Sequence, residues 1–195
     1  MATAGPPTRY AALLRGVNVG GKKLAMADLR GLLTGLGHDD VSTLLQSGNA
    51  VFTAPRSDPG ALAAEIEKAL ATELGLVSKV LLRNHSEIEA VVDGNPFPTA
   101  EEEPAKHLVQ FLFDPLGPAE RALIEEFDAA PFAPEEFRVG AGVIYFRFPN
   151  GIGRNVMDAA FTKHLTANFP KPVRPAMTGR NWNTVRKLRD LTAEG

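Results

Sequence analysis

Apolar residues recur along the first half of the chain with two spacings, one typical of strands and one typical of helices. Short apolar runs predict strands at 10–14, 41–46, 50–53 and 76–82. Apolar residues three or four positions apart predict helices at 26–36 and 59–74, the second with Asp58 as N-cap, and a short helix follows at 86–92. The resulting order is β-α-β-β-α-β with one trailing helix.

The same order returns in the second half of the chain. Strands are predicted at 107–113, 137–139, 143–148 and 173–177, and helices at 118–129, 155–167 and 181–191. Because an error in one half would not be expected to recur in the other, the two patterns support each other. The sequence therefore predicts an α+β protein of two tandem ferredoxin-like (βαββαβ) plaits, each with a trailing helix. We expect a first domain at 8–94, an acidic, proline-rich linker at 95–105 and a second domain at 106–195.

The predicted topology brings distant loops together. In such a plait the right-handed crossover makes the first two strands parallel, so both of them end at the same edge of the sheet. We therefore expect the glycine-rich stretch 15–23 to lie beside the turn at 47–49. The same argument in the second half joins the loop at 150–155 with the strand end at 178–181.

These loop ends have the residue types of an anion-binding site. Glycine-rich loops and helix N-termini expose backbone N–H groups, and arginine can hold a phosphate or carboxylate with two parallel bonds. The tryptophan follows the second basic strand end, where it either anchors the core or lines a ligand pocket. The candidate residues are Arg15, Asn18, Gly20, Gly21, Lys22, Lys23, Ser47, Asn49, Arg154, Asn155, Arg180, Asn181 and Trp182. The alternative interpretation is structural, with glycine and asparagine serving tight turns and arginine side chains in solvent.

Three motifs in this order resemble an uncharacterised bacterial family, "domain of unknown function 1697". They are Arg15-Gly-Val-Asn-Val-Gly-Gly-Lys22, Gln46-Ser-Gly-Asn49 and Thr178-Gly-Arg-Asn-Trp-Asn-Thr-Val185, and the resemblance runs from about residue 10 to 191. It implies a cytoplasmic bacterial protein of two ferredoxin-like domains. It implies no activity, because none is established for the family.

The composition excludes some kinds of site chemistry and indicates where in the cell the protein works. The chain has no cysteine, which excludes disulfides, thiolate zinc sites and thiol nucleophiles, and favours a cytoplasmic location. The first apolar run ends at Arg15 and is too short for a signal-peptide core or a bilayer span, so we expect no membrane partner. The four histidines lack the paired spacing of a metal site, and no cofactor is evident.

No motif fixes a reaction, so the sequence does not decide whether the protein is an enzyme. The segment 16–22 has the spacing of a phosphate-binding P-loop, but Lys23 stands where serine or threonine must hold magnesium. If there is catalysis, transfer or hydrolysis on a phosphate- or carboxylate-bearing molecule is the expected class. Ser47 or His164 would then have to move the proton.

Charge is segregated along the chain, with a net −11 in residues 56–137 and +7 in residues 138–195. The basic final third keeps a non-catalytic nucleic-acid-binding module open as an alternative, through contacts to phosphates. A protein-interaction adaptor is the third class. The primary hypothesis is an anionic small molecule bound at the loop ends, and the oligomeric state is not predicted.

Overall fold

The computed structural model describes residues 7–18, 20, 23–55 and 58–193 of the 195. The chain divides into two compact units, one comprising the residues up to Glu89 together with those from Lys187 onward, the other running from Ala90 to Arg186. The domain boundaries expected from the sequence, 8–94 and 106–195, stay a prediction. The two units are described separately below.

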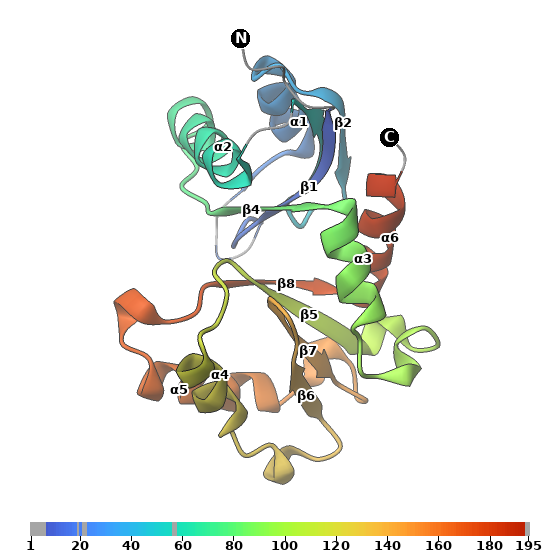
Figure 1. Cartoon of the computed structure of the whole chain (residues 1–195), viewed down its shortest axis with the longest axis vertical. Coiled ribbons are helices and arrows are strands. Elements are labelled where there is room, and N and C mark those ends of the chain that lie inside the picture. Colours follow the sequence, from blue (N-terminus) through green and yellow to red (C-terminus); the bar gives the residue numbers. More distant parts are fainter. Residues whose placement is uncertain (1–6, 19, 21–22, 56–57, 194–195) are drawn as a thin grey trace. The chain divides into compact units, whose positions relative to one another are not determined.

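The first unit contains the elements predicted for the first half, in the predicted order (Figure 1). They are β1 (Thr8–Leu14), α1 (Met26–Gly35), β2 (Asp39–Leu44), β3 (Asn49–Ala54), α2 (Pro59–Leu74), β4 (Val80–Asn84) and the start of α3 (His85–Asp93). The strands form one sheet in the order β2-β3-β1-β4, and every neighbouring pair is antiparallel. The last turns of α6 (Trp182–Ala193) also belong to this unit.

Helix α2 shows how local sequence sets the ends of an element. The Asp58 side chain accepts a hydrogen bond from the backbone N–H of Ala61 at 2.8 Å, and Pro59 occupies the first helical position. Gly75 ends the helix in the left-handed conformation, with φ of 62°. The buried positions of the helix recur with helical spacing and are Leu62, Ile66, Ala69 and Leu70.

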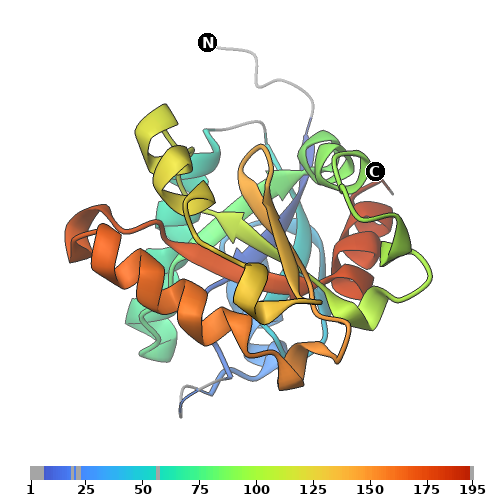
Figure 2. The same cartoon turned by 90° about the horizontal axis from the view of Figure 1, so that it is seen from below.

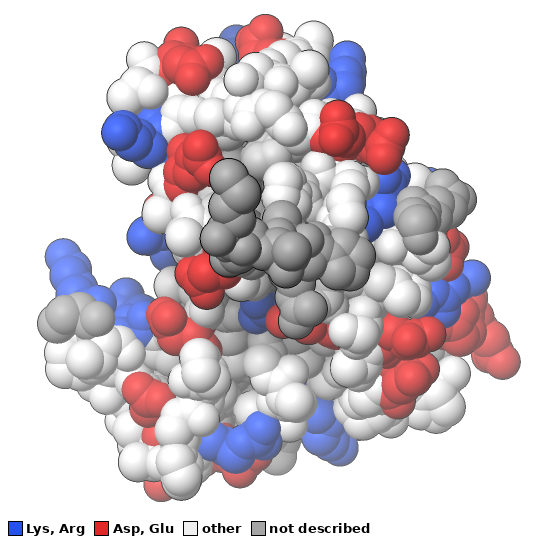
Figure 3. Space-filling model, turned by 45° about the horizontal axis from the view of Figure 1, so that its top comes forward, with Lys and Arg blue, Asp and Glu red and all other residues white. Residues whose placement is uncertain are grey.

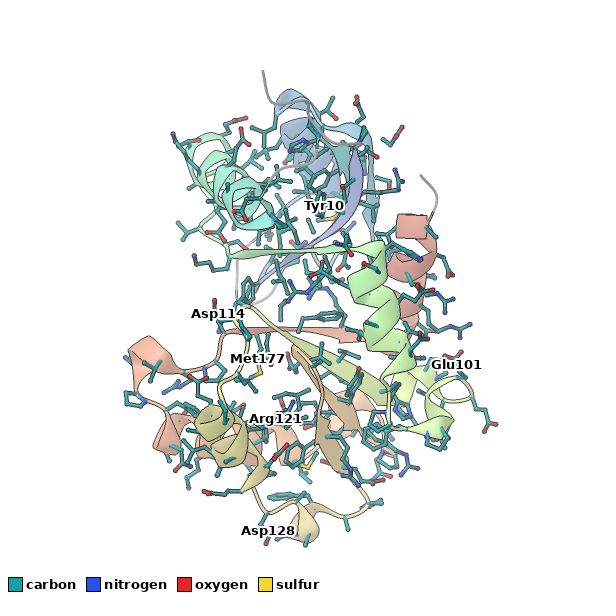
Figure 4. The ribbon with its side chains drawn as sticks, in the orientation of Figure 1. Tyr10, Glu101, Asp114, Arg121, Asp128 and Met177 are labelled. Atoms are coloured by element: carbon teal, nitrogen blue, oxygen red, sulfur yellow. The ribbon has the colours of Figure 1, made fainter. Side chains whose placement is uncertain are left out.

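The core of the first unit lies between the sheet and the helices α1 and α2. Alternate residues of β1 enter it, among them Tyr10 (Figure 4), and Phe52 joins them from β3. Helix α1 contributes Leu29 and Leu33. Both helices therefore cover the same face of the sheet.

The second unit repeats this arrangement with different side chains. Its elements are the rest of α3, β5 (His107–Leu112), α4 (Pro118–Glu125), β6 (Glu136–Val139), β7 (Val143–Arg147), α5 (Met157–Asn168), β8 (Met177–Asn181) and the first turns of α6, with short 3-10 helices η1 (Pro98–Ala100), η2 (Pro104–Lys106), η3 (Ala130–Phe132), η4 (Ile152–Arg154) and η5 (Lys171–Val173). The sheet order is β6-β7-β5-β8, again wholly antiparallel.

Phenylalanine dominates the core of the second unit. Helix α5 crosses one face of the sheet (Figure 2), and the ring of its Phe161 makes edge contacts with Phe127 and Phe146 at 5.2 Å between centroids. The chain is therefore α+β, with two four-stranded antiparallel sheets and six α-helices among the described residues.

Two strands lie later in the sequence than predicted: β4 runs from Val80 to Asn84 where the pattern predicted 76–82, and β8 is shifted as well. The pattern placed a strand at 173–177, but β8 runs from Met177 to Asn181. The preceding stretch contains prolines at 170, 172 and 175, which have no N–H group to donate to a neighbouring strand. Pairing with β5 consequently begins only after Pro175, and this shift places Arg180 inside a strand.

Gly48 lies where the turn before β3 closely approaches the loop after β1 in the first unit. Its φ is +70°, and a Cβ atom there would lie 2.2 Å from Cγ2 of Val17. Gly37 has φ of +83° but open space around it, so Gly37→Ala carries the conformational cost alone. We expect Gly48→Ala to lower the free energy of unfolding by about 2 kcal/mol more than Gly37→Ala, in urea titrations of both variants. Equal losses would show that the turn relaxes freely.

His38 is buried against the Phe52 ring, with ring centroids 4.5 Å apart. Its Nε2 atom has no hydrogen-bond partner among the described residues. Burial lowers the pKa of the His38 ring, and the opposing effects of Glu65 and Asp39 are smaller. The folded first unit therefore holds this imidazole neutral.

Acidification should consequently destabilise the first unit. The pKa of His38 is lower in the folded chain, so the unfolded chain takes up the proton first. Stability is retained above the unfolded pKa of about 6.5 and falls as the pH drops through that value toward the lowered folded pKa. We expect the urea midpoint of His38→Gln to change less on acidification than that of the natural chain. An NMR titration placing the His38 pKa at or above 6.5 would contradict this.

Candidate functional site

The loop after β1 and the turn before β3 are neighbours, as the topology predicted. The backbone N–H of Leu14 donates to the carbonyl of Gly48 at 2.9 Å. The side-chain amide of Asn18 donates to the carbonyl of Gln46. The predicted candidates Gly21 and Lys22 lie outside the described residues, while Gly20 and Lys23 are exposed.

The asparagine side chains hold this region together. Asn18, in the left-handed conformation with φ of 55°, accepts from the N–H of Leu24 at 2.9 Å and donates to the Leu24 carbonyl at 3.0 Å. Asn49 is buried and donates to the carbonyl of Leu44 at 3.0 Å and to Oγ of Ser47 at 2.8 Å. Their polar atoms thus stabilise the loop conformation, and a direct role in ligand binding stays a prediction.

Arg15 lies at the rim of a hollow of about 540 Å³ in the first unit. Its backbone N–H donates to the Lys79 carbonyl at 2.9 Å, and the Ser78 hydroxyl donates to the Arg15 carbonyl at 2.9 Å. These bonds tie the end of β1 to the segment that leads into β4. The lining residues are Arg15, Gly16, Ala64, Glu67, Lys68, Val77, Ser78 and Lys79.

The charge of this hollow is positive. Arg15 and Lys68 are exposed, and neither side chain has a hydrogen-bond or ionic partner among the described residues. The acidic residue of the lining, Glu67, pairs with Nζ of Lys79 at 3.1 Å and accepts from the N–H of Val80 at 2.9 Å. Its charge is therefore already compensated, which leaves two cations facing the open space.

Of the residues that line this hollow, sequence reasoning singled out Arg15 alone and missed the other side. Lys68 and Glu67 come from the exposed side of α2, and Ser78 with Lys79 from the approach to β4. Each has the ordinary pattern of a surface residue. The pairing of β1 with β4 is the signal that would have found them, because it places residue 79 opposite residue 15.

In the second unit the end of the predicted loop at 150–155, between β7 and α5, is occupied by the protein's own carboxylate. Glu135 is only 4% exposed, and its two oxygens accept from the N–H groups of Val156 at 3.0 Å and Met157 at 2.8 Å, at the start of α5. Asn155 caps the same helix by accepting from the N–H of Asp158 at 3.0 Å. Burial, with a smaller contribution from Glu135, raises the pKa of Asp158.

The predicted basic residues of the second unit differ in exposure. Arg154 is exposed on η4, whereas Arg180 is only 5% exposed in β8, where its Nη1 atom donates to the Thr178 hydroxyl at 2.8 Å. Burial lowers the pKa of Arg180 to about 10. Trp182 is fully buried, and its indole N–H donates to the carboxylate of Glu101 at 2.9 Å (Figure 4 labels Glu101), as expected of a core anchor.

Arg180 and Asn181 have counterparts in the first unit that sequence reasoning did not single out. Arg83 is the last residue but one of β4, as Arg180 is of β8. Burial lowers the pKa of Arg83 as well. The next residue is an asparagine in both cases: Asn84 accepts from the N–H of Glu87 at 3.0 Å, and Asn181 from that of Thr184 at 2.9 Å. The repeated Arg-Asn pair thus ends a strand and begins a helix.

These features define an α+β protein of two antiparallel sheets with a basic hollow beside the first strand. The sequence matches the family described as "Protein of unknown function (DUF1697)" over residues 8–145, and the chain belongs to this family. The third motif, at 178–185, lies beyond the matched residues.

A solved structure is also similar to this chain. It is the conserved bacterial protein SP0830 from Streptococcus pneumoniae, with 27% sequence identity and a TM-score of 0.71, and the match covers 96% of this chain and 99% of that one. No curated protein matches the sequence significantly. In the described part of the chain, no helix has the length and apolar character needed to cross a membrane.

The buried carboxylate of Glu135 at the start of α5 leads to a prediction about stability. Glu135→Gln keeps the shape but replaces one accepting oxygen with an amide group that cannot accept from the backbone N–H. We expect a loss of about 1–3 kcal/mol in the free energy of unfolding. Glu126→Gln, at an exposed helix end, is the control and should change stability by less than about 0.5 kcal/mol. Equal effects in both variants, measured by urea unfolding, would disprove the role of Glu135.

Proposed function

We propose that the first unit binds a small anionic molecule in the hollow beside Arg15. The observation that supports this is the charge imbalance of the lining, where Arg15 and Lys68 have no partner among the described residues and Glu67 is compensated by Lys79. A guanidinium and an ammonium that line the same open hollow attract a phosphate or carboxylate group.

The remaining lining indicates what else the ligand carries. Val77 has 77% of its surface exposed, and Ala64 lies on the same lining. An apolar part of the ligand would cover these side chains and gain from the removal of apolar surface from water. The ligand class is therefore a phosphate- or carboxylate-bearing molecule with an apolar portion. No group of the lining supplies an evident nucleophile, and the proposal is one of binding.

We further infer that both units are ferredoxin-like plaits and that the protein works in the cytoplasm. The strand orders β2-β3-β1-β4 and β6-β7-β5-β8 support the first inference, because they follow one pattern in both halves. The absence of cysteine from the sequence supports the second.

Nucleic acid is the rival partner. On the face shown in Figure 3, lysine and arginine side chains are interspersed with aspartate and glutamate and form no continuous basic stripe. Binding to phosphate backbones favours a basic stripe along one face. The small-molecule proposal is preferred because Arg15 and Lys68 line a hollow, and nucleic acid becomes an outcome of the test.

The test is a thermal-shift screen followed by calorimetry. Inorganic phosphate, adenosine monophosphate, citrate and aliphatic carboxylates are the probes, with a single-stranded oligonucleotide in parallel. We expect one or more of the small anions to stabilise the protein, and Arg15→Ala and Lys68→Ala each to weaken its binding about tenfold. Lys187→Ala removes an exposed cation outside the hollow and is the charge-matched control.

Two outcomes would refute the proposal. One is the absence of any small anion that stabilises the protein. The other is an equal loss of affinity in Lys187→Ala and Arg15→Ala, which would point to general charge attraction. Binding of the oligonucleotide alone, with strong salt dependence, would favour the nucleic-acid alternative.

A further inference from the structure

A second hollow, of about 560 Å³, lies in the first unit at the opposite end of β1. It is formed where β1 begins, beside β2, the start of α3 and the last turn of α6. The lining residues are Pro7, Thr8, Arg9, Asp40, Thr53, Asn84, His85, Ser86 and Thr192. Its lining carries one cation, Arg9, and one carboxylate, Asp40.

Arg9 is the cation, and its position is fixed by the fold. The side chain is only 13% exposed, with Nε donating to the Leu191 carbonyl at 2.7 Å and Nη1 to the Thr53 hydroxyl at 3.2 Å. The third nitrogen, Nη2, has no hydrogen-bond partner among the described residues. A guanidinium held in this way can bind an acceptor without further loss of side-chain freedom.

Asp40 is the anion, and it stands where the strand is irregular. The pairing of β2 with β3 shifts between Asp39 and Ser42, and Asp40 has φ of +50°. Such bulges redirect side chains, and aspartate tolerates the left-handed conformation. The carboxylate is 71% exposed, lies 3.8 Å from Nη1 of Arg9 and accepts from the Thr53 hydroxyl at 3.3 Å. Most of its accepting capacity therefore remains open to solvent.

His85 adds an imidazole ring to the lining. Its Nδ1 atom lies 3.1 Å from the carbonyl of Arg189. A carbonyl can only accept, so Nδ1 carries the hydrogen and the lone pair of the neutral ring is on Nε2. The nearest carboxylate oxygen, of Glu89, is 3.8 Å from Nε2, too far for a hydrogen bond.

We propose that this hollow binds a small zwitterion that carries a carboxylate and an ammonium group close together, as an α-amino acid does. The carboxylate would pair with Nη2 of Arg9, and the ammonium would donate to Asp40 and to Nε2 of His85. A simple anion is repelled by Asp40 and a simple cation by Arg9. A ligand with both charges would pair with each side chain where it has capacity left, at Nη2 of Arg9 and on the Asp40 carboxylate, which is 71% exposed.

The contacts of Arg9 and His85 with α6 also have a structural consequence, because both residues bind carbonyls near the end of that helix. Helix docking alone needs no charge at position 40. A substitution at Asp40 therefore distinguishes a ligand-binding site from a purely structural arrangement. The main variant of the test is at this position.

The experiment titrates the full-length protein with the common L-amino acids and follows backbone amide signals by NMR. We expect at least one amino acid to shift the signals of residues around Arg9 and Asp40. Its analogues without the amino group, or with the carboxylate converted to an amide, should bind at least about tenfold more weakly. An analogue that binds as tightly as the parent amino acid would overturn the two-charge arrangement.

Three variants complete the test. Asp40→Asn keeps the side-chain shape and the left-handed backbone, and should weaken binding about tenfold or more. Asp39→Asn makes the same change one residue away, outside the lining, and should bind as the natural chain does. His85→Asn keeps an N–H group toward the Arg189 carbonyl but removes Nε2, and should weaken binding without unfolding α6.

Failure of this proposal is distinguishable from failure of the first. Arg15→Ala should leave amino-acid binding unchanged, because Arg15 lines the other hollow. No shift with any amino acid, or equal losses in Asp40→Asn and Asp39→Asn, would overturn the inference.

Discussion

The central position of β1 determines where the candidate residues of the first unit lie. This strand is hydrogen-bonded to β3 on one side and to β4 on the other. At its end, Leu14 bonds to Gly48 and Arg15 to Lys79, which sets the rim of one hollow. At its start, Arg9 reaches Thr53 of β3 and the end of α6, which sets the wall of the other. Both proposed sites therefore depend on the register of one buried strand.

The candidate sites of the two units lie at different places in the repeated order of elements and differ in how their acidic side chains are placed. Loops between strands and helices offer backbone N–H groups to an anion. In the second unit, Glu135 fills that position from within the chain and becomes buried as it does so. In the first unit, the acidic residue of the hollow, Glu67, is paired with Lys79, while Arg15 remains exposed. Basic residues in a repeated fold thus need not mark repeated binding sites.

Most of the fold could be predicted from the sequence, because apolar spacing and turn residues are local signals. The order of elements in both halves and the meeting of the 15–23 loop with the 47–49 turn follow from them. The start of β8 was wrong because the prolines before Met177 delay strand pairing. Arg180 was expected as a loop residue, and its burial follows from that shift.

The site residues that could not be predicted from the sequence are those whose positions depend on pairing between distant segments. Nothing local distinguishes Lys68 from other surface lysines, or Asp40 from Asp39 beside it. Their distinction comes from the register of β1 with β4, and from the bulge that turns β2 at Asp40. Likewise, the tautomer of His85 is decided by a carbonyl more than a hundred positions away in the chain.

The repeated Arg-Asn pair shows which parts of the sequence the duplicated fold itself requires. Asn84 and Asn181 each begin a helix where a strand ends, and the arginine before each is half-buried (Arg83) or buried (Arg180). Both halves share this role, and hydrogen bonds within the chain account for it. It is therefore a property of the fold. The features present in one half alone, such as the exposed Arg15 and the left-handed Asp40, are the ones that such a role does not explain. For this reason the functional proposals concern the first unit.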